Sequence, residues 1–249
     1  VGIYAEALLL GVGYEIGEAV GAADRLDPLQ LCGNGGLHAA VCKSSEAEVD
    51  VGNALIGQLV VQACVNSLGT AAVAGYTAAT KVDQLSVLVN TAYQIAISGY
   101  VAQNYGAHRF DRIREGVRAS LIQLESVNVL MCAAMLLARR AVVSLFIDAP
   151  TEEIISYAGG YLTAVAPFYV VLGLLIVYRS AVQSMGNSTA PFLACVVELV
   201  MRISGALGLA RVLGYTGVCF SSPLAWIGAT ALLIPFYRRE MRKGKNIAA

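Results

Sequence analysis

Two residues that could carry ionic chemistry, Glu198 and Arg202, stand four positions apart in an apolar run. On a helix this spacing places both side chains on one face, with the glutamate first, which is the favourable order. A single charge at the centre of a bilayer costs about 2.5–3.5 kcal/mol on the insertion scale. A charged pair in such a run is therefore expected to have a functional or structural role. It could couple a cavity to protons or substrate, or it could lock helices together. We favour the structural interpretation.

A second group of polar residues borders another apolar run. Lys81, Asp83 and Gln84 could line a cavity or could be solvated at a membrane interface, and both interpretations stay open. Hydrogen-bonding side chains follow along the same run, where they could bond to other helices, their usual use in membranes, or line a cavity. They are Asn90, Tyr93, Gln94, Gln103 and Asn104. Glu125 and Arg179 stand near the ends of other runs, and we expect them to extend toward the interface.

Composition separates this chain from soluble enzymes and from nucleic-acid-binding proteins. Of its 249 residues, 57% are hydrophobic and 14% are charged, against about 25% charged in typical soluble domains. The formal net charge is zero, which leaves no overall basic surface for nucleic acid. There is no phosphate-binding loop, no histidine zinc motif and no cysteine pair with metal-ligand spacing. We therefore expect no enzyme activity, no catalytic residues, no cofactor and no metal.

The arrangement of charge predicts membrane-spanning helices. Four stretches contain no Asp, Glu, Lys or Arg: 51–80, 84–107, 154–178 and 212–237. Each is long enough to cross the hydrocarbon core as a helix, which takes about 20 residues. They lack the alternation of porin-like strands. We expect six spans, at about 51–69, 71–106, 119–140, 154–180, 191–213 and 218–237. The predicted fold class is an all-α integral membrane protein with a six-helix bundle.

The first fifty residues do not follow this pattern. Residues 1–50 mix glycine, alanine and leucine with scattered charges, and we leave them unassigned, as a segment that an altered reading frame or degradation could explain. Residues 51–249 form the predicted bundle, with its first helix the least certain.

Basic residues predict the orientation. Residues 108–118 carry four arginines and residues 238–245 carry five basic residues, which together make nine of the seventeen Lys and Arg. Loops rich in Lys and Arg face the cytoplasm. We therefore expect a multi-pass protein of the cytoplasmic membrane with the 108–118 loop and the C-terminus in the cytoplasm. The arginines of that loop are expected to meet anionic lipid.

Four blocks of sequence resemble the C-terminal half of multidrug and toxic compound extrusion (MATE) transporters. They are "NSLGTAAVAGYTAATKVDQL" (66–85), "YVAQNYGAHRFDRIREGVRAS" (100–120), "APFYVVLGLLIVYRSAVQSMGNSTAP" (166–191) and "ELVMRISGALGLARVLGYTGV" (198–218). The resemblance implies two pseudo-symmetric bundles of six helices around a central cavity, of which this chain would be the second.

Function and partners follow from that resemblance. Such transporters export organic cations and other amphipathic compounds in exchange for protons or sodium ions. The partners implied are a small organic substrate, a coupling proton or sodium ion, the lipid bilayer and a first, N-terminal bundle that this chain lacks. In the family the stretch around Lys81, Asp83 and Gln84 lines the upper part of the second bundle. Two alternatives stay open: a lipid-linked oligosaccharide flippase of related architecture, and a membrane fragment that transports nothing.

Overall fold

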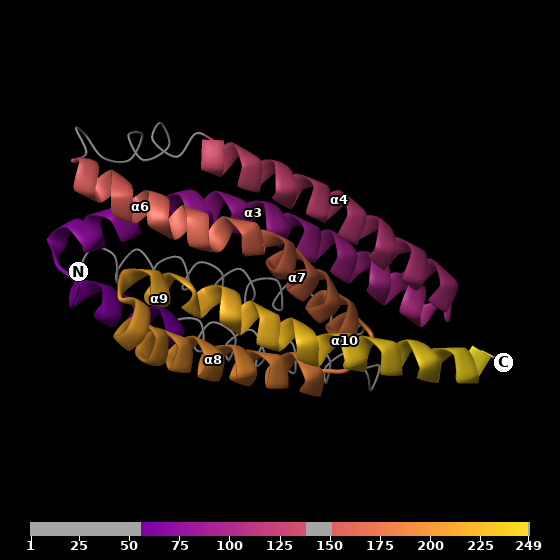
Figure 1. The fold of residues 1–249 in the computed structure, drawn as a ribbon. Coiled ribbons are helices and arrows are strands. Elements are labelled where there is room, and N and C mark those ends of the chain that lie inside the picture. The colour runs from indigo at the N-terminus through magenta and orange to yellow at the C-terminus, as the bar shows by residue number, and fades with distance from the viewer. Residues whose placement is uncertain (1–55, 138–150, 249) are drawn as a thin grey trace, which may run out of the picture. The chain divides into compact units, whose positions relative to one another are not determined.

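Helices account for all the regular secondary structure in the part of the chain that the computed structural model describes, residues 56–137 and 151–248 (Figure 1). A helix over Ile56–Asn66 comes first. The elements that follow are α3 (Thr70–Gly106), α4 (Phe110–Leu137), α6 (Glu152–Val165), the 3₁₀ turn η1 (Ala166–Phe168), α7 (Tyr169–Ser184), α8 (Thr189–Leu213), α9 (Tyr215–Cys219) and α10 (Ser221–Ala248). The predicted fold class is confirmed. The unassigned segment 1–50 and the start of the first predicted span lie outside the described residues.

Five helical stretches are long and apolar enough to cross a membrane: Thr70–Gly106, Phe110–Leu137, Glu152–Ser184, Thr189–Leu213 and Tyr215–Gly244. The shortest has 25 residues, and at 1.5 Å per residue it extends about 37 Å. This exceeds the hydrocarbon thickness of about 30 Å. The chain is therefore a multi-pass membrane protein, as its sequence predicts.

The second predicted span matches α3 closely, whereas the third begins nine residues before its predicted start at about 119, because α4 starts at Phe110. Gly69 has a φ of 104°, a conformation that glycine adopts at little cost, and it separates the first helix from α3. The expected loop over residues 108–118 is wrong, because α4 already begins at Phe110. Phe110 and Ile113 are buried, and the arginines between and after them are good helix formers. The end predicted at 140 lies outside the described residues.

The fourth and sixth spans also differ from the prediction. Pro167 lies in η1, which divides the fourth span into α6 and α7. Proline has no N–H to donate and its ring disturbs the preceding turn, so a break there is expected. After α8 the chain turns at Gly214, with a φ of 57°, into the five-residue α9. Helix α10 continues to Ala248, eleven residues beyond the predicted end at 237, so most of the basic tail is helical.

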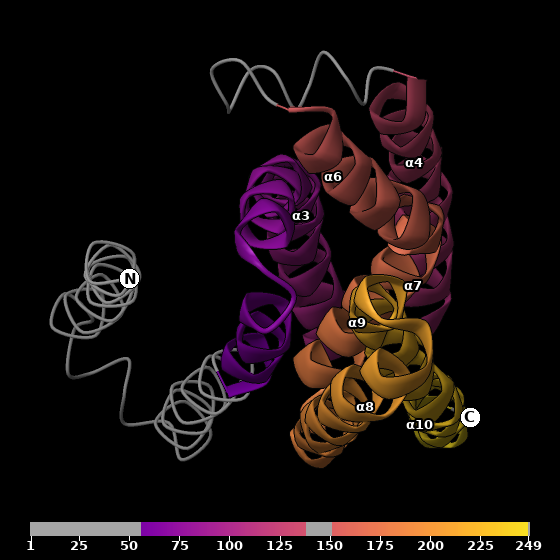
Figure 2. The same cartoon turned by 60° about the vertical axis from the view of Figure 1, so that its left-hand side comes forward.

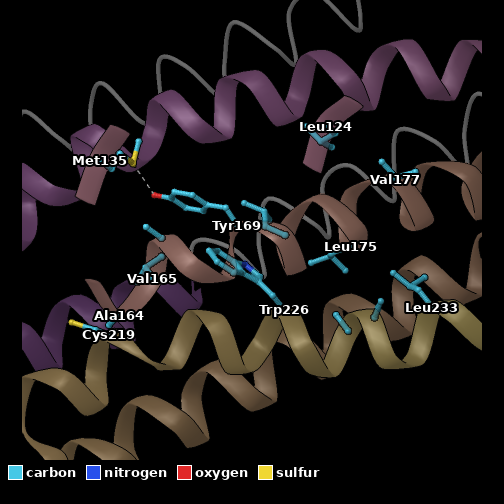
Figure 3. Packing of buried hydrophobic residues seen from close by; sticks show 14 of the residues in the cluster. Leu124, Met135, Ala164, Val165, Tyr169, Leu175, Val177, Cys219, Trp226 and Leu233 are labelled. Carbon is cyan, nitrogen blue, oxygen red and sulfur yellow. Dashed lines mark hydrogen bonds between the residues drawn. The ribbon is translucent and has the colours of Figure 1, made fainter. Parts of the chain in front are cut away.

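Helix α7 lies between two groups of helices. On one side α3 packs against α4, α6 and α7, and on the other α10 packs against α7 and α8 (Figures 1 and 2). The buried core joins them. Figure 3 shows the ring of Tyr169 extending from α7 toward Met135 of α4, with Trp226, Leu175 and Leu233 between α7 and α10.

Large apolar side chains also cover much of the outside. Leu88 and Ile95 of α3 are 69% and 71% exposed, and Leu130 of α4 is 69% exposed. A soluble protein seldom exposes so much apolar surface. In a bilayer these side chains meet lipid at no such cost, which agrees with the membrane assignment.

Candidate functional site

Asp83 of α3 is held by tyrosines from two other helices. The hydroxyl of Tyr169 donates to Oδ1 at 2.6 Å, and the hydroxyl of Tyr161 donates to Oδ2 at 3.3 Å. Tyr161 belongs to α6 and Tyr169 to α7, so the two donors lie on either side of the η1 break. Tyr169 also contacts Met135 Sδ at 3.5 Å. Its single hydroxyl proton serves the carboxylate, because hydrogen bonds to charged acceptors are the stronger ones.

A further tyrosine extends the Asp83 cluster to the first helix. Tyr76 packs edge-on against Tyr161, with ring centroids 5.3 Å apart. Gln58 donates from Nε2 to the Tyr76 hydroxyl at 3.1 Å. Contacts therefore lead from Asp83 through two tyrosines, Tyr161 and then Tyr76, to Gln58 of helix 56–66.

Lys81 and Gln84 do not join Asp83 in the same way. Gln84 is exposed, one residue beyond Asp83 but on another face of α3. Lys81 is half-buried and two positions before Asp83, a spacing that also directs it to a different face of the helix. Asp83 is thus the one of these three neighbours whose carboxylate is bonded to the buried tyrosines of α6 and α7.

Glu198 is the centre of an ion cluster rather than of a pair. Its Oε1 accepts from Arg202 Nη2 at 2.7 Å, which confirms the predicted contact within α8. Its Oε2 accepts from Arg179 Nη2 of α7 at 2.8 Å. The side chains are only 13% to 18% exposed. The expectation that Arg179 extends to the interface is therefore wrong, because the negative charge of Glu198 lies within its reach.

A glycine makes room for this cluster. A Cβ atom on Gly57 would lie 2.8 Å from Cδ of Arg202. Gly57 precedes Gln58, the residue that bonds to Tyr76. Helix 56–66 thus contacts the Glu198 cluster and the Asp83 cluster through consecutive residues. In the sequence, Arg179 follows directly after a charge-free stretch, and this position could have indicated a buried ion-pair partner. The expectation that it extends toward the interface rests instead on its long aliphatic side chain.

The polar residues along α3 separate into different environments. Asn90 is buried, donating to the Ser86 carbonyl at 2.8 Å and to Oδ1 of Asn128 at 3.2 Å. Asn128 of α4 was not singled out from the sequence, and it also donates to the Tyr169 carbonyl at 3.0 Å. The bond joins α3 to α4, which is the interhelical use expected of Asn in membranes. The other predicted lining residues are half-buried or exposed: Tyr93, Gln94, Gln103 and Asn104.

Glu125 does not extend to an interface. Both of its carboxylate oxygens are buried inside the bundle. The expectation of a carboxylate near water is wrong because α4 begins nine residues earlier than predicted, which moves Glu125 deeper along the helix.

The basic segments gather at one end of the bundle. A Cβ atom on Gly244 would meet the ring of Phe110, so the end of α10 lies beside the start of α4. Asn187, in the turn between α7 and α8, donates to Glu240 Oε1 at 2.9 Å. The arginines of α4 and the basic residues of α10 therefore lie on the same side, as predicted.

Comparison with known families identifies the bundle. The MatE family model matches residues 53–207. The chain belongs to the MatE family. The resemblance seen in its sequence is confirmed, and members of this family are transporters rather than enzymes. No curated protein sequence matches the chain.

Solved MATE structures have the same fold as this MatE chain. The Vibrio cholerae transporter VcmN in its bent form superposes with a TM-score of 0.76 at 18% identity, over 86% of this chain and 49% of VcmN. An outward-facing multidrug resistance MATE transporter gives 0.75 at 15% identity, over 83% and 47%. A Pyrococcus furiosus transporter, described as having a binding pocket of reverse polarity, gives 0.72 at 16% identity, over 78% and 43%. The chain spans less than half of each solved structure and has the fold of one bundle.

Proposed function

We propose that this chain is the second bundle of a cation-coupled antiporter that exports organic cations or drugs across the cytoplasmic membrane. The observation that carries the proposal is Asp83, a carboxylate that accepts hydrogen bonds from α6 and α7 on both sides of a helix break. A titratable group so placed can link proton or sodium binding to a change in helix geometry. Intramembrane ionisable residues that face a bundle interior commonly mark ion pathways.

Ion binding at Asp83 is coupled to the helix geometry through the two hydrogen bonds from Tyr161 and Tyr169. An ionised Asp83 accepts both hydroxyl protons strongly and draws α6 and α7 onto α3. A protonated Asp83 is a weaker acceptor, and a sodium ion would compete with the hydroxyls for its oxygens. Either event loosens α6 and α7 at η1, where Pro167 already removes a backbone hydrogen bond. The expected motion is a bend that favours one of the two states of alternating access.

Alternating access requires a second body. Inverted-repeat transporters move one bundle against another around a central site, so we propose a first bundle as the partner of this one. The basic end, with α4 and α10, faces the cytoplasm in this proposal because short Lys/Arg-rich segments stay on that side.

The test is transport of a cationic dye in cells that lack their own efflux pumps. The cells express the native gene, with any coding sequence that flanks the chain, as wild type, Asp83→Asn or Glu115→Gln. Glu115 is exposed on α4 and serves as the matched control. We expect gradient-dependent dye export by the wild type and Glu115→Gln but not by Asp83→Asn. Export by Asp83→Asn that equals the wild type, at equal protein in the membrane, would reject Asp83 as the coupling residue.

The same cells distinguish the fragment alternative. Residues 1–249 expressed alone should leave dye accumulation unchanged, because alternating access needs a second bundle to move against. If that chain alone exports dye in a gradient-dependent way, the requirement for a partner bundle is wrong.

A second candidate function, a flippase for lipid-linked oligosaccharides, is favoured by one observation. The cluster of Arg179, Glu198 and Arg202 carries one more positive than negative charge within the bundle. An anionic pyrophosphate group would complement that charge. In this case Arg202→Gln would abolish lipid flipping in proteoliposomes, and no dye export would be seen with any variant.

A further inference from the structure

Glu125 lies in the interior of α4, away from the other charged residues of that helix. The nearest charged residue on the helix, Arg118, is seven residues earlier, or about 10 Å along the axis. In the other direction α4 continues for twelve residues to Leu137, or about 18 Å. The lipid-facing side of this segment is apolar, with Ile122 and Val129 exposed, whereas Leu124 and Asn128 are buried. Glu125 borders the packed side.

A glycine of α7 accommodates the carboxylate. A Cβ atom on Gly173 would lie 2.6 Å from Oε1 of Glu125 and 2.6 Å from Nδ2 of Asn128. The glutamate and the amide therefore occupy the space that a side chain on α7 would otherwise fill. Within the described residues, neither carboxylate oxygen of Glu125 makes a hydrogen bond of ordinary geometry.

The neighbouring amide of Asn128 also bonds to two other helices. Asn128 donates from Nδ2 to the Tyr169 carbonyl at 3.0 Å, and its Oδ1 accepts from Asn90 at 3.2 Å. The Tyr169 hydroxyl in turn donates to Asp83. Polar groups thus lead from Asp83 on α3, through Tyr169 on α7, to Asn128 and the carboxyl of Glu125 on α4.

None of the ion pairs found among the described residues includes Glu125. Among the side chains that the structure describes, the charged ones on the elements that pack against α4 are Lys81 and Asp83 on α3, Glu152 and Glu153 on α6, Arg179 on α7, and Arg238, Arg239, Glu240, Arg242 and Lys243 on α10. Arg179 is bonded to Glu198, and Asp83 to two tyrosines. A buried carboxylate that has one amide group beside it and no counter-charge is costly, and a bound proton removes the charge.

We propose that Glu125 is a second proton-binding site of this bundle, in addition to Asp83. A proton fits this site better than a metal ion. Sodium and other hard cations need several oxygen ligands, whereas the polar atom that shares the space at Gly173 with Glu125 is the Nδ2 of Asn128, which donates. In the described part of the chain no three His, Cys, Asp or Glu side chains come together as a metal site. The role of this proton in transport rests on the proposed function, whereas the proton-binding site itself does not.

The experiment is labelling of membranes that contain the protein with dicyclohexylcarbodiimide. This apolar reagent reacts with a protonated carboxyl: the proton passes to a carbodiimide nitrogen, and the carboxylate oxygen bonds to the central carbon. Mass spectrometry of peptides then locates the adduct. We expect an adduct on Glu125 that decreases about tenfold or more between about pH 6 and about pH 9, as the proton is lost. The exposed Glu115 on the same helix should stay unmodified throughout this range.

Two variants control the assignment. Glu125→Gln should remove the adduct from its peptide, and Glu115→Gln should leave the labelling of Glu125 unchanged. Both should elute as the wild type does in size-exclusion chromatography in detergent. The labelling of wild-type protein tests the proton site by itself, even if Glu125→Gln fails to fold. Absence of an adduct on Glu125 in folded wild-type protein at every pH would overturn the proposal.

Sodium separates a proton site from a metal-ion site. Replacing potassium by sodium at constant pH and ionic strength should not change the labelling of Glu125, and protection by sodium would overturn the assignment to a proton. Labelling needs no transport. If dye export fails while Glu125 is labelled as expected, the proposed function is rejected and the proton site stands. If dye export succeeds and Glu125 is not labelled, only the proton site is rejected.

Discussion

The hydroxyl of Tyr169 lies 2.6 Å from Oδ1 of Asp83, and this hydrogen bond ties the first turn of α7 to the middle of α3. Tyr161 reaches the other carboxylate oxygen from α6 at a longer 3.3 Å. One aspartate therefore bridges the break at η1. The shorter bond carries more of that connection, because hydrogen bonds weaken as they lengthen.

Removing the shorter bond should destabilise the bundle measurably. Tyr169→Phe leaves Oδ1 of Asp83 buried without its main donor, and we expect a loss of about 1–3 kcal/mol in the free energy of unfolding. Thermal unfolding in detergent measures it. Tyr100→Phe is the matched control, since the Tyr100 hydroxyl bonds to the Arg112 carbonyl at an exposed site. A Tyr169→Phe effect no larger than that of Tyr100→Phe would show that the Asp83 bond contributes little.

The ion cluster should respond unequally to the removal of its members. Glu198→Gln leaves two arginines facing each other, and we expect a destabilisation of about 3 kcal/mol or more. Arg179→Met leaves the neutral pair of Glu198 and Arg202 intact and should cost clearly less. The folded yield and the unfolding temperature of each variant test this order. If losing Arg179 costs as much as losing Glu198, the cluster is not organised around the glutamate.

A double-mutant cycle measures the coupling within α8 that the sequence predicted. Replacing both Glu198 and Arg202 with apolar residues should harm the folded yield less than the sum of the two single replacements, because a lone buried charge loses its partner. Additive losses would mean that the two side chains do not interact, in conflict with their 2.7 Å contact.

Two glycines of α3 should give opposite results with the same substitution. A Cβ atom on Gly75 would lie 2.7 Å from Cβ of Tyr157 and 2.9 Å from the Ile154 carbonyl oxygen, so Gly75→Ala must separate α3 from α6. We expect a destabilisation of about 1–3 kcal/mol. Gly99 has nothing within 4 Å of its Cβ position, and Gly99→Ala should stabilise the helix by about 0.5–1 kcal/mol. Equal effects on the unfolding temperature would contradict the close packing of α3 on α6.

The orientation can be tested with single cysteines in a cysteine-free background. Ala107 and Arg242 are exposed at the basic end, and Glu153 is exposed at the opposite end. We expect Ala107→Cys and Arg242→Cys to resist membrane-impermeant thiol reagents in intact cells and Glu153→Cys to react. Gly244 is unsuitable, because a side chain there would meet Phe110. The reverse pattern of labelling would place the basic end outside the cell.

The sequence alone determined the features that depend on contact between the chain and its solvent. Long charge-free stretches must be helices in lipid because the backbone has no water to bond to. This reasoning yielded the fold class and the bounds of α3. The contact between Glu198 and Arg202 was also predictable, since a spacing of four residues fixes their relative position on any helix.

Only the tertiary structure decided which residues from different helices meet. Arg179 with Glu198, Tyr161 and Tyr169 with Asp83, and the burial of Glu125 depend on how far each helix is rotated and shifted against its neighbours. That register is set by side-chain packing over the whole contact, including small residues such as Gly57 and Gly173 that allow close approach. The sequence pattern of one helix predicts which of its faces is apolar. It does not predict which residue of a neighbouring helix lies at the same height along the bundle.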